Sequence, residues 1–249
     1  MKKQTIYSLV TALSDPRFET YKARAGNDRH KALELYLWNI DMSRAVAATT
    51  GMVEVQLRNS INQALADWNQ EQDVTTPGRS TCYSADWLQD PAPRLAQIIN
   101  PPKKPPLWQS ALAALKDENG NFKKRRSEYT HDDFVAALTF GTWTYLLPKP
   151  NTGENNPRRY LWEHALKNSF SARNRSGHDH ESHTVIYHWA NSVRYARNRA
   201  NHLEPLLDDR EVTWYHRASL RLLNSMNPAA ASWLAGQSYI PSTLRARPF

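Results

Sequence analysis

The sequence predicts an all-α fold that forms a single domain over residues 1–249. Apolar residues recur at three- and four-residue intervals along several long stretches, which is the period of an amphipathic helix. No stretch shows the sustained alternation of apolar and polar residues that is typical of a strand. Hydrophobic residues make up 40% of the chain, with nine Trp and eleven Tyr, so we expect a packed core rather than a disordered basic chain.

The first expected helix covers Ile6 to Leu13. This run is short, contains polar residues and lacks a small-residue cleavage site, so it does not fit a signal peptide. No segment reaches the 18 or so apolar residues that a membrane span requires. Cys82 is the only cysteine, which excludes an intramolecular disulfide and a cysteine-built zinc site. These features predict a cytoplasmic protein with no membrane attachment.

A strong helical pattern follows from Asp28 to Trp68. Asp28 is expected to cap this helix, and Gly51 is expected to divide it into two. Glu54, Arg58 and Asn59 lie beside the apolar face of the second part. Glu54 and Arg58 have the spacing of a helical ion pair, worth about 0.3–0.5 kcal/mol when exposed. The alternative to an exposed ion pair is that Glu54 reaches into a polar groove and orients Arg197 or His202 by a hydrogen bond.

Residues 73–108 contain seven of the fifteen prolines of the chain. Proline interrupts helices, so we expect a surface insertion here, either a spacer or a segment that binds an aromatic groove of a partner. The basic run Lys123, Lys124, Arg125 and Arg126 follows. It is either a solvated loop or a contact for a phosphate backbone.

Capping signals predict the remaining helices. Thr130 and Asp133 form a capping-box pattern that opens a helix as far as Tyr145, ending near Pro148. Further helix starts are expected at Pro157, at Asp208 or Asp209, and at Asn227. The intervening cluster of His178, Asp179, His180, Glu181 and His183 could bind a transition metal, although a flexible basic loop is the alternative.

The stretch from His183 to Pro205 predicts a long helix with two unequal faces. The residues expected on its core stripe are Ile186, Trp189, Val193, Ala196, Ala200 and Leu203. The opposite face carries Arg194, Arg197, Asn198, Asn201 and His202, with Arg199 on the other flank. Pro205 is expected to end the helix.

Arg197 and His202 together suggest RNA cleavage. Histidine can exchange the proton of a 2′-hydroxyl or a 5′-oxygen at neutral pH, and arginine can stabilise charge on phosphorus. Five helical steps separate the two side chains by about 140°, so they converge only if the last turn distorts or both reach a shared groove. The alternative is a solvated arginine and a histidine that interacts with the helix dipole. The formal net charge of +8 also fits a polyanionic partner.

Two groups of residues resemble the Abi-like abortive-infection proteins of bacteria, within the HEPN superfamily of helical RNases. The N-terminal group comprises residues 14–18, Tyr21, residues 32–39 and Glu54 to Asn59. The C-terminal group comprises residues 140–143, Leu161, Trp162, Phe170 and residues 197–205. Residues 73–108 lie outside the resemblance.

The resemblance implies a HEPN-like helical bundle in which two protomers join their Arg-x4-His segments into a metal-independent RNase site. Arg197 would stabilise the phosphate, His202 would act as general acid and base, and Asn198 would orient them. Glu54, Arg58 and Asn59 would support the site, and no cofactor is expected. RNA contacts would come from Arg194, Arg199, Lys123, Lys124, Arg125 and Arg126.

We therefore expect a homodimeric endoribonuclease toxin in phage defence that produces 2′,3′-cyclic phosphate ends, with a protein antitoxin or a noncoding RNA as a possible inhibitor. Asn201 stands where many relatives place a second histidine. This difference, together with the dispersed cations, supports an alternative, which is a non-catalytic RNA-binding or complex-forming module. A metal-dependent hydrolase that uses the 178–183 histidines is a third hypothesis.

Overall fold

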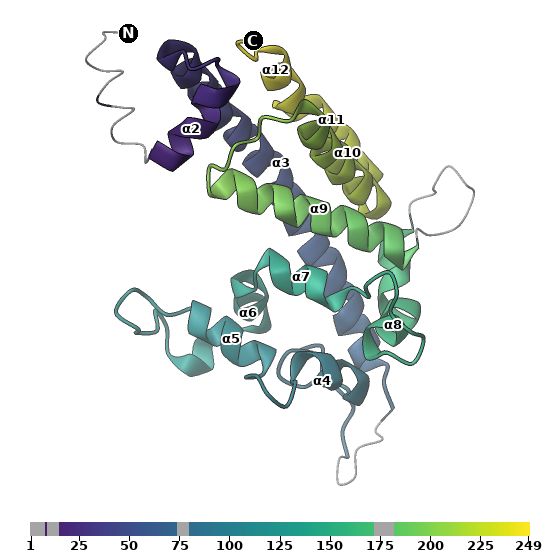
Figure 1. Cartoon of the computed structure of the whole chain (residues 1–249). Coiled ribbons are helices and arrows are strands. Elements are labelled where there is room, and N and C mark those ends of the chain that lie inside the picture. Colours follow the sequence, from purple (N-terminus) through teal and green to yellow (C-terminus); the bar gives the residue numbers. More distant parts are fainter. Residues whose placement is uncertain (1–7, 9–14, 74–79, 172–181) are drawn as a thin grey trace.

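The computed structural model describes Ser8 and residues 15–73, 80–171 and 182–249. In these ranges the chain folds into helices joined by loops, and the only β pairing is an isolated bridge between Lys116 and Phe122 (Figure 1). The all-α prediction is therefore confirmed. The expected helix from Ile6 to Leu13 lies outside the described residues, apart from Ser8, which is helical.

Helix α3 (Arg29–Gln70) is the axis of the molecule. Asp28 caps it as predicted, because its carboxylate accepts hydrogen bonds from the backbone N–H groups of His30 and Lys31. The predicted break at Gly51 is wrong, since α3 continues through this residue for 42 residues, about 63 Å. An interior glycine costs a helix about 1 kcal/mol, which burial of Val46 and Val53 on either side offsets.

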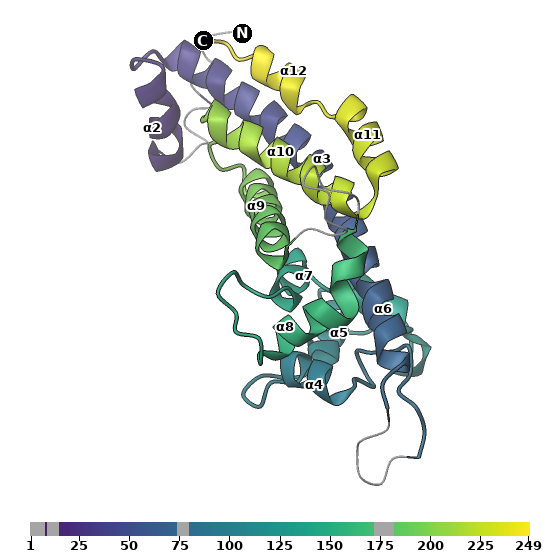
Figure 2. The same ribbon diagram turned by 90° about the vertical axis from the view of Figure 1, so that its right-hand side faces the viewer.

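The first half of α3 packs with α2 (Asp15–Arg24), α10 (Asp209–Met226) and α12 (Ile240–Arg245), and α11 (Pro228–Gln237) lies on α10 (Figures 1 and 2). Asp208 and Asn227 cap α10 and α11 as predicted. The apolar residues of α2, α12, the first half of α3 and the first half of α10 form one core, to which both ends of the described chain contribute. The second half of α10 and α11 contribute to the other core.

The second half of α3 carries a larger core built from short helices. These are α4 (Pro93–Ile99), α5 (Leu107–Ala114), α6 (His131–Ala137), α7 (Phe140–Leu146) and α8 (Pro157–Leu161). A 3-10 turn η1 (Arg126–Glu128) precedes α6, and α8 continues into a π-helical turn η2 (Trp162–Leu166) and a 3-10 turn η3 (Lys167–Phe170).

Two predictions about this region need correction. The described part of this segment, residues 80–108, is not a surface insertion, because Trp87, Leu88, Leu95 and other apolar side chains in it are buried in the core. The expected helix from Thr130 to Tyr145 is two helices: the capping box of Thr130 is present, but Leu138 and Thr139 are extended and separate α6 from α7. Pro157 begins α8 as predicted, with Asn156 as its cap.

Helix α9 (His183–Asn201) crosses α3 and runs between the two groups of helices (Figure 1). Its predicted core stripe is mostly correct, although Ala190 is buried while Trp189 and Leu203 are only partly buried. The helix ends four residues before Pro205. Among the described residues, no helix is both long enough and apolar enough to cross a membrane.

Candidate functional site

Arg197 of α9 contacts Glu54 of α3. The Arg197 Nε lies 3.4 Å from the Glu54 Oε2, and the two side chains are 36% and 18% exposed, respectively. The crossing of α9 over α3 produces this contact, which joins two residues far apart in the sequence. Glu54 therefore reaches Arg197, as one of the two interpretations of its sequence position predicts.

Burial raises the pKa of Glu54 above its ordinary value. The charges of Arg197 and Arg58 and a hydrogen bond from the backbone N–H of Phe140 act in the opposite direction but do not cancel the effect of burial. The carboxyl group thus takes up a proton at a higher pH than an exposed glutamate does. A proton-exchanging carboxyl beside a guanidinium is an arrangement that can serve acid–base chemistry on a phosphate ester.

Three polar residues flank this contact. The Oδ1 of Asn198 accepts a 3.5 Å hydrogen bond from the Nη1 of Arg197, and the Oδ1 of Asn59 accepts one of the same length from the Nε of Arg58. Arg58 lies near enough to Glu54 to lower its pKa. We call these five residues, Glu54, Arg58, Asn59, Arg197 and Asn198, the Arg197 cluster.

His202 lies at the end of α9, outside this cluster. It is the C-cap residue, its side chain is exposed, and its carbonyl oxygen accepts a 3.1 Å hydrogen bond from the Nη2 of Arg17. Within the described ranges, no hydrogen bond or ion pair joins its ring to Arg197. The last turn of α9 therefore does not bring the two side chains together in one chain.

The chain turns sharply after His202. Leu203 has a φ of +50°, and the N–H groups of Leu203 and Glu204 donate to the carbonyl oxygens of Ala200 and Arg199. This is a Schellman motif, whose left-handed position normally holds glycine, so a leucine there costs about 1 kcal/mol. The motif ends α9 before Pro205 and fixes where His202 lies.

Asn39 of α3 holds the segment after this turn. The side chain is fully buried. Its Nδ2 donates to the carbonyl oxygen of Glu204 at 3.2 Å, and its Oδ1 accepts from the backbone N–H of Leu206 at 2.7 Å. A buried asparagine that satisfies two backbone groups of a distant loop fixes the path of that loop.

Arg199 makes its contacts within the fold, and its expected role in RNA binding stays a prediction. Its Nε lies 3.4 Å from Glu204, its Nη1 pairs with Glu211 and Tyr215, and its Nη2 donates to the carbonyl oxygen of Pro205. The side chain is only 14% exposed. All three guanidinium nitrogens have partners among the described residues, so most of the donor groups of Arg199 are engaged within the fold.

The basic run is partly neutralised by neighbouring carboxylates. Lys124 bonds to Asp133 at 2.9 Å, and Arg125 bonds to Glu128 at 2.6 Å. The four cations of the basic run are exposed and lie in the connection between α5 and α6. Arg194 lies on α9, where its Nη2 donates to the Oδ1 of Asn191 at 2.8 Å.

The expected metal-like cluster lies mainly outside the described residues, which include only His183 of its five members. His183 contacts Arg159, and burial together with the Arg159 charge lowers the pKa of the histidine. Elsewhere in the described ranges, no group of three or more His, Cys, Asp or Glu side chains is placed to hold a metal ion.

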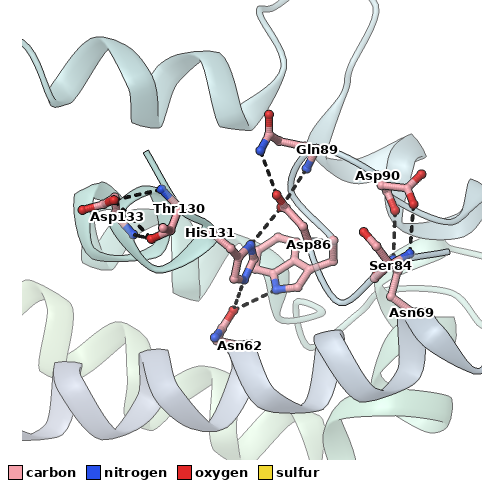
Figure 3. A network of polar contacts seen from close by, with 10 residues as sticks. Asn62, Asn69, Ser84, Asp86, Gln89, Asp90, Thr130, His131 and Asp133 are labelled. Carbon is pink, nitrogen blue, oxygen red and sulfur yellow. Dashed lines mark hydrogen bonds and ion pairs between the residues drawn. The ribbon is translucent and has the colours of Figure 1, made fainter. Parts of the chain in front are cut away.

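A second polar network was missed from the sequence and joins three segments around His131 (Figure 3). The His131 Nδ1 lies 2.9 Å from the Oδ1 of Asp86, and its Nε2 lies 2.8 Å from the Oδ1 of Asn62. The Nε1 of Trp87 donates to the same Asn62 oxygen at 2.9 Å. Both ring nitrogens of His131 thus lie within hydrogen-bonding distance of an oxygen atom.

The position of this network identifies it as structural. It fastens Asp86, Trp87 and α6 to α3. Trp87 is fully buried and packs edge-on against His131. Burial alone would raise the pKa of Asp86, but hydrogen bonds from His131 and Gln89 outweigh it and lower the pKa. A hydrogen-bonded pair of His131 and Asp86 that supports core packing explains these residues without a ligand.

The Arg197 cluster is therefore the leading candidate for a functional site. It combines a partly exposed guanidinium, a carboxyl group of raised pKa and side-chain amides on two crossing helices. Comparisons with protein-family models, with curated proteins and with solved structures find no match for this chain. The case for function thus rests on the residues and their geometry.

Proposed function

We propose that the protein is a cytoplasmic, metal-independent endoribonuclease toxin of the Abi-like type, with a HEPN-like bundle, that acts in phage defence. The observation that carries the proposal is the contact between Arg197 and Glu54 at the centre of the Arg197 cluster. It provides a permanent cation and a proton-exchanging group on one surface, and RNA cleavage without a metal requires both.

In the proposed reaction, the 2′-hydroxyl oxygen of one nucleotide attacks the adjacent phosphorus. The hydroxyl proton goes to a general base, the bond from phosphorus to the 5′-oxygen breaks, and that oxygen receives a proton from a general acid. The products are a 2′,3′-cyclic phosphate and a free 5′-hydroxyl. Arg197 stabilises the negative charge on the phosphoryl oxygens, and Asn198 holds the guanidinium in position.

His202 enters this site through a homodimer. Because its ring is exposed at the end of α9, a second protomer can approach it, and two α9 ends that face one another would combine Arg197 and His202 from both chains. His202 then acts as general acid and base. Glu54 orients Arg197 and, with its raised pKa, is a further group able to exchange a proton.

A cleavage assay with end-labelled single-stranded RNA in excess EDTA tests this proposal. Wild type should release cyclic-phosphate ends, and Arg197→Ala and His202→Ala should each lose about 100-fold or more in rate. Arg44→Ala and His30→Ala are matched controls, since both positions are exposed and lie away from the Arg197 cluster. Unchanged cleavage by folded His202→Ala would overturn the assignment.

A non-catalytic RNA-binding module is the second candidate. The observation that favours it is the separation of the exposed His202 ring from Arg197 within one chain, together with Asn201 in place of a second histidine. This candidate predicts salt-sensitive RNA binding and no strand scission at any protein concentration. Analytical ultracentrifugation beside the cleavage assay separates it from an enzyme that has not dimerised.

A further inference from the structure

A cavity of about 470 Å³ lies beside the Arg197 cluster, between α7, the loop that follows it, the start of α8 and α9. Its volume falls within the range of about 300–1,000 Å³ that is usual for ligand sites. Three cations, Lys149, Arg158 and Arg194, and two aromatic rings, Tyr145 and Tyr187, line it. Among the described residues, no carboxylate lines it, so this lining favours an anion.

Two of these cations are held in place without being neutralised. The Arg158 Nε donates to the carbonyl oxygen of Tyr145 at 2.7 Å, and its guanidinium lies 4.0 Å from the centre of the Tyr145 ring. Arg194 is held by the Oδ1 of Asn191, which also lines the cavity. In the part of the chain that the structure describes, none of the three cations forms an ion pair, unlike Arg199.

The cavity adjoins the Arg197 cluster through two elements. Arg194 precedes Arg197 on α9 by three residues, so the two side chains project from the same side of the helix about 4.5 Å apart along its axis. Gly141 lines the cavity and follows Phe140, whose N–H is bonded to Glu54. The cavity is therefore a neighbour of the Arg197 cluster, within reach of an RNA strand held at Arg197.

We propose that this cavity binds one nucleotide of the RNA strand, next to the phosphate held at Arg197. Lys149, Arg158 and Arg194 bind its phosphate group, and the base stacks against the partly exposed ring of Tyr187, a contact worth about 1–3 kcal/mol per base. The inference rests on the proposed function, which it extends by naming a subsite. A free nucleotide carries the same chemistry, so the test separates the two sources.

The test measures binding of a fluorescent single-stranded RNA whose 2′-O-methyl groups prevent cleavage. Lys149→Glu should weaken binding about tenfold and reduce the dependence on salt, because one phosphate contact is lost. Lys103→Glu is the matched control: it makes the same charge change at an exposed position outside the cavity and should leave affinity within about twofold. Equal affinities for the two variants would overturn the inference.

Two further measurements identify the ligand. The first titrates adenosine 5′-monophosphate and uridine 5′-monophosphate against wild type by calorimetry, and both should bind far more weakly than the RNA. The second compares Tyr187 variants: Tyr187→Ala should weaken RNA binding, and Tyr187→Phe should restore it. Tight mononucleotide binding that displaces the RNA would overturn the subsite and assign the cavity to a free nucleotide. Equal RNA affinities for Tyr187→Ala and wild type would exclude stacking on Tyr187.

The subsite and the proposed function can fail separately. If Arg197→Ala abolishes cleavage while Lys149→Glu and Lys103→Glu bind RNA equally, the endoribonuclease proposal is supported and the subsite proposal is refuted. If wild type never cuts RNA while Lys149→Glu still weakens binding, the cavity remains an RNA site and the nuclease assignment fails.

Discussion

The contact between Arg197 and Glu54 predicts an asymmetric response to mutation. Since the pKa of Glu54 is raised, burial of its charge destabilises the fold more than Arg197, Arg58 and the Phe140 N–H stabilise it. Glu54→Gln should therefore leave the free energy of unfolding at pH 7 unchanged or raise it. Arg197→Ala should lower the free energy of unfolding, because the Glu54 carboxylate remains buried and charged but loses the neighbouring cation.

The geometry sets the size of the coupling between the two residues. Unit charges 3.4 Å apart attract one another by about 1 kcal/mol at the dielectric constant of water and by about 5 kcal/mol at an effective value of 20. Arg197 is 36% exposed, so water screens the pair and the lower figure applies. A double-mutant cycle should thus give a coupling free energy of about 1 kcal/mol.

Urea unfolding of wild type, Glu54→Gln, Arg197→Ala and the double variant at pH 7 measures this coupling. The double variant should be more stable than Arg197→Ala. A loss of more than about 1 kcal/mol in Glu54→Gln alone, or a coupling indistinguishable from zero, would refute the reasoning.

The pH dependence provides an independent test. Because the pKa of Glu54 is higher in the folded than in the unfolded protein, the folded state binds more protons between the two values. Wild type should therefore lose stability relative to Glu54→Gln as the pH rises from the ordinary value of 4.5 through the folded value. Below that interval the two proteins should differ little. If the difference in stability between wild type and Glu54→Gln does not change with pH, the raised pKa of Glu54 is contradicted.

Two other predictions concern buried polar residues. Asn39→Ala should lower the free energy of unfolding by about 2–3 kcal/mol, because the Leu206 N–H and the Glu204 carbonyl lose their partner, and urea unfolding checks this value. Asp86→Asn should cost about 1–2 kcal/mol at pH 7, measured in the same way, because it removes the charge that faces His131. Since the pKa of Asp86 is lowered, its contribution is present above its ordinary value of 3.8 and is lost as the pH falls, so the difference should shrink in acid.

Helix starts could be predicted from sequence because the chemistry of a cap is local. Asp28, Thr130, Asp208 and Asn227 each bond to backbone N–H groups two or three residues ahead, and these bonds depend little on the rest of the fold. The all-α class followed from the same kind of local pattern. Features that a few neighbouring residues determine were therefore accessible without the structure.

Helix ends and interruptions were harder to predict from the sequence, because packing determines where they occur. Gly51 carries a breaking signal that burial around it overrides, whereas Thr139 carries none and yet separates two helices. Trp87 and Leu88 are fully buried although they lie in the proline-rich segment. Proline excludes long helices without keeping a segment out of the core.

The candidate site was predicted only in part. Arg197 could be selected because it lies on the polar face of its helix. For Glu54 the sequence allowed two interpretations, which were an exposed ion pair with Arg58 and a contact with Arg197 or His202. The fold-supporting role of Arg199 and the network around His131 depend on Glu211, Asp86 and other residues that are distant in sequence. A single sequence does not reveal such pairings, since each member alone resembles an ordinary surface residue.

The core around the first half of α3 constrains how the protein can be made. It joins both ends of the described chain, and the bond between Asn39 and Leu206 spans 167 positions. During synthesis, the apolar side of this half of α3 emerges long before α9, α10 and α12 exist to cover it. The Arg197 cluster also needs both halves of the chain. A ribosome-bound nascent chain would thus expose this apolar face, and would need protection from aggregation, until α12 has been synthesised.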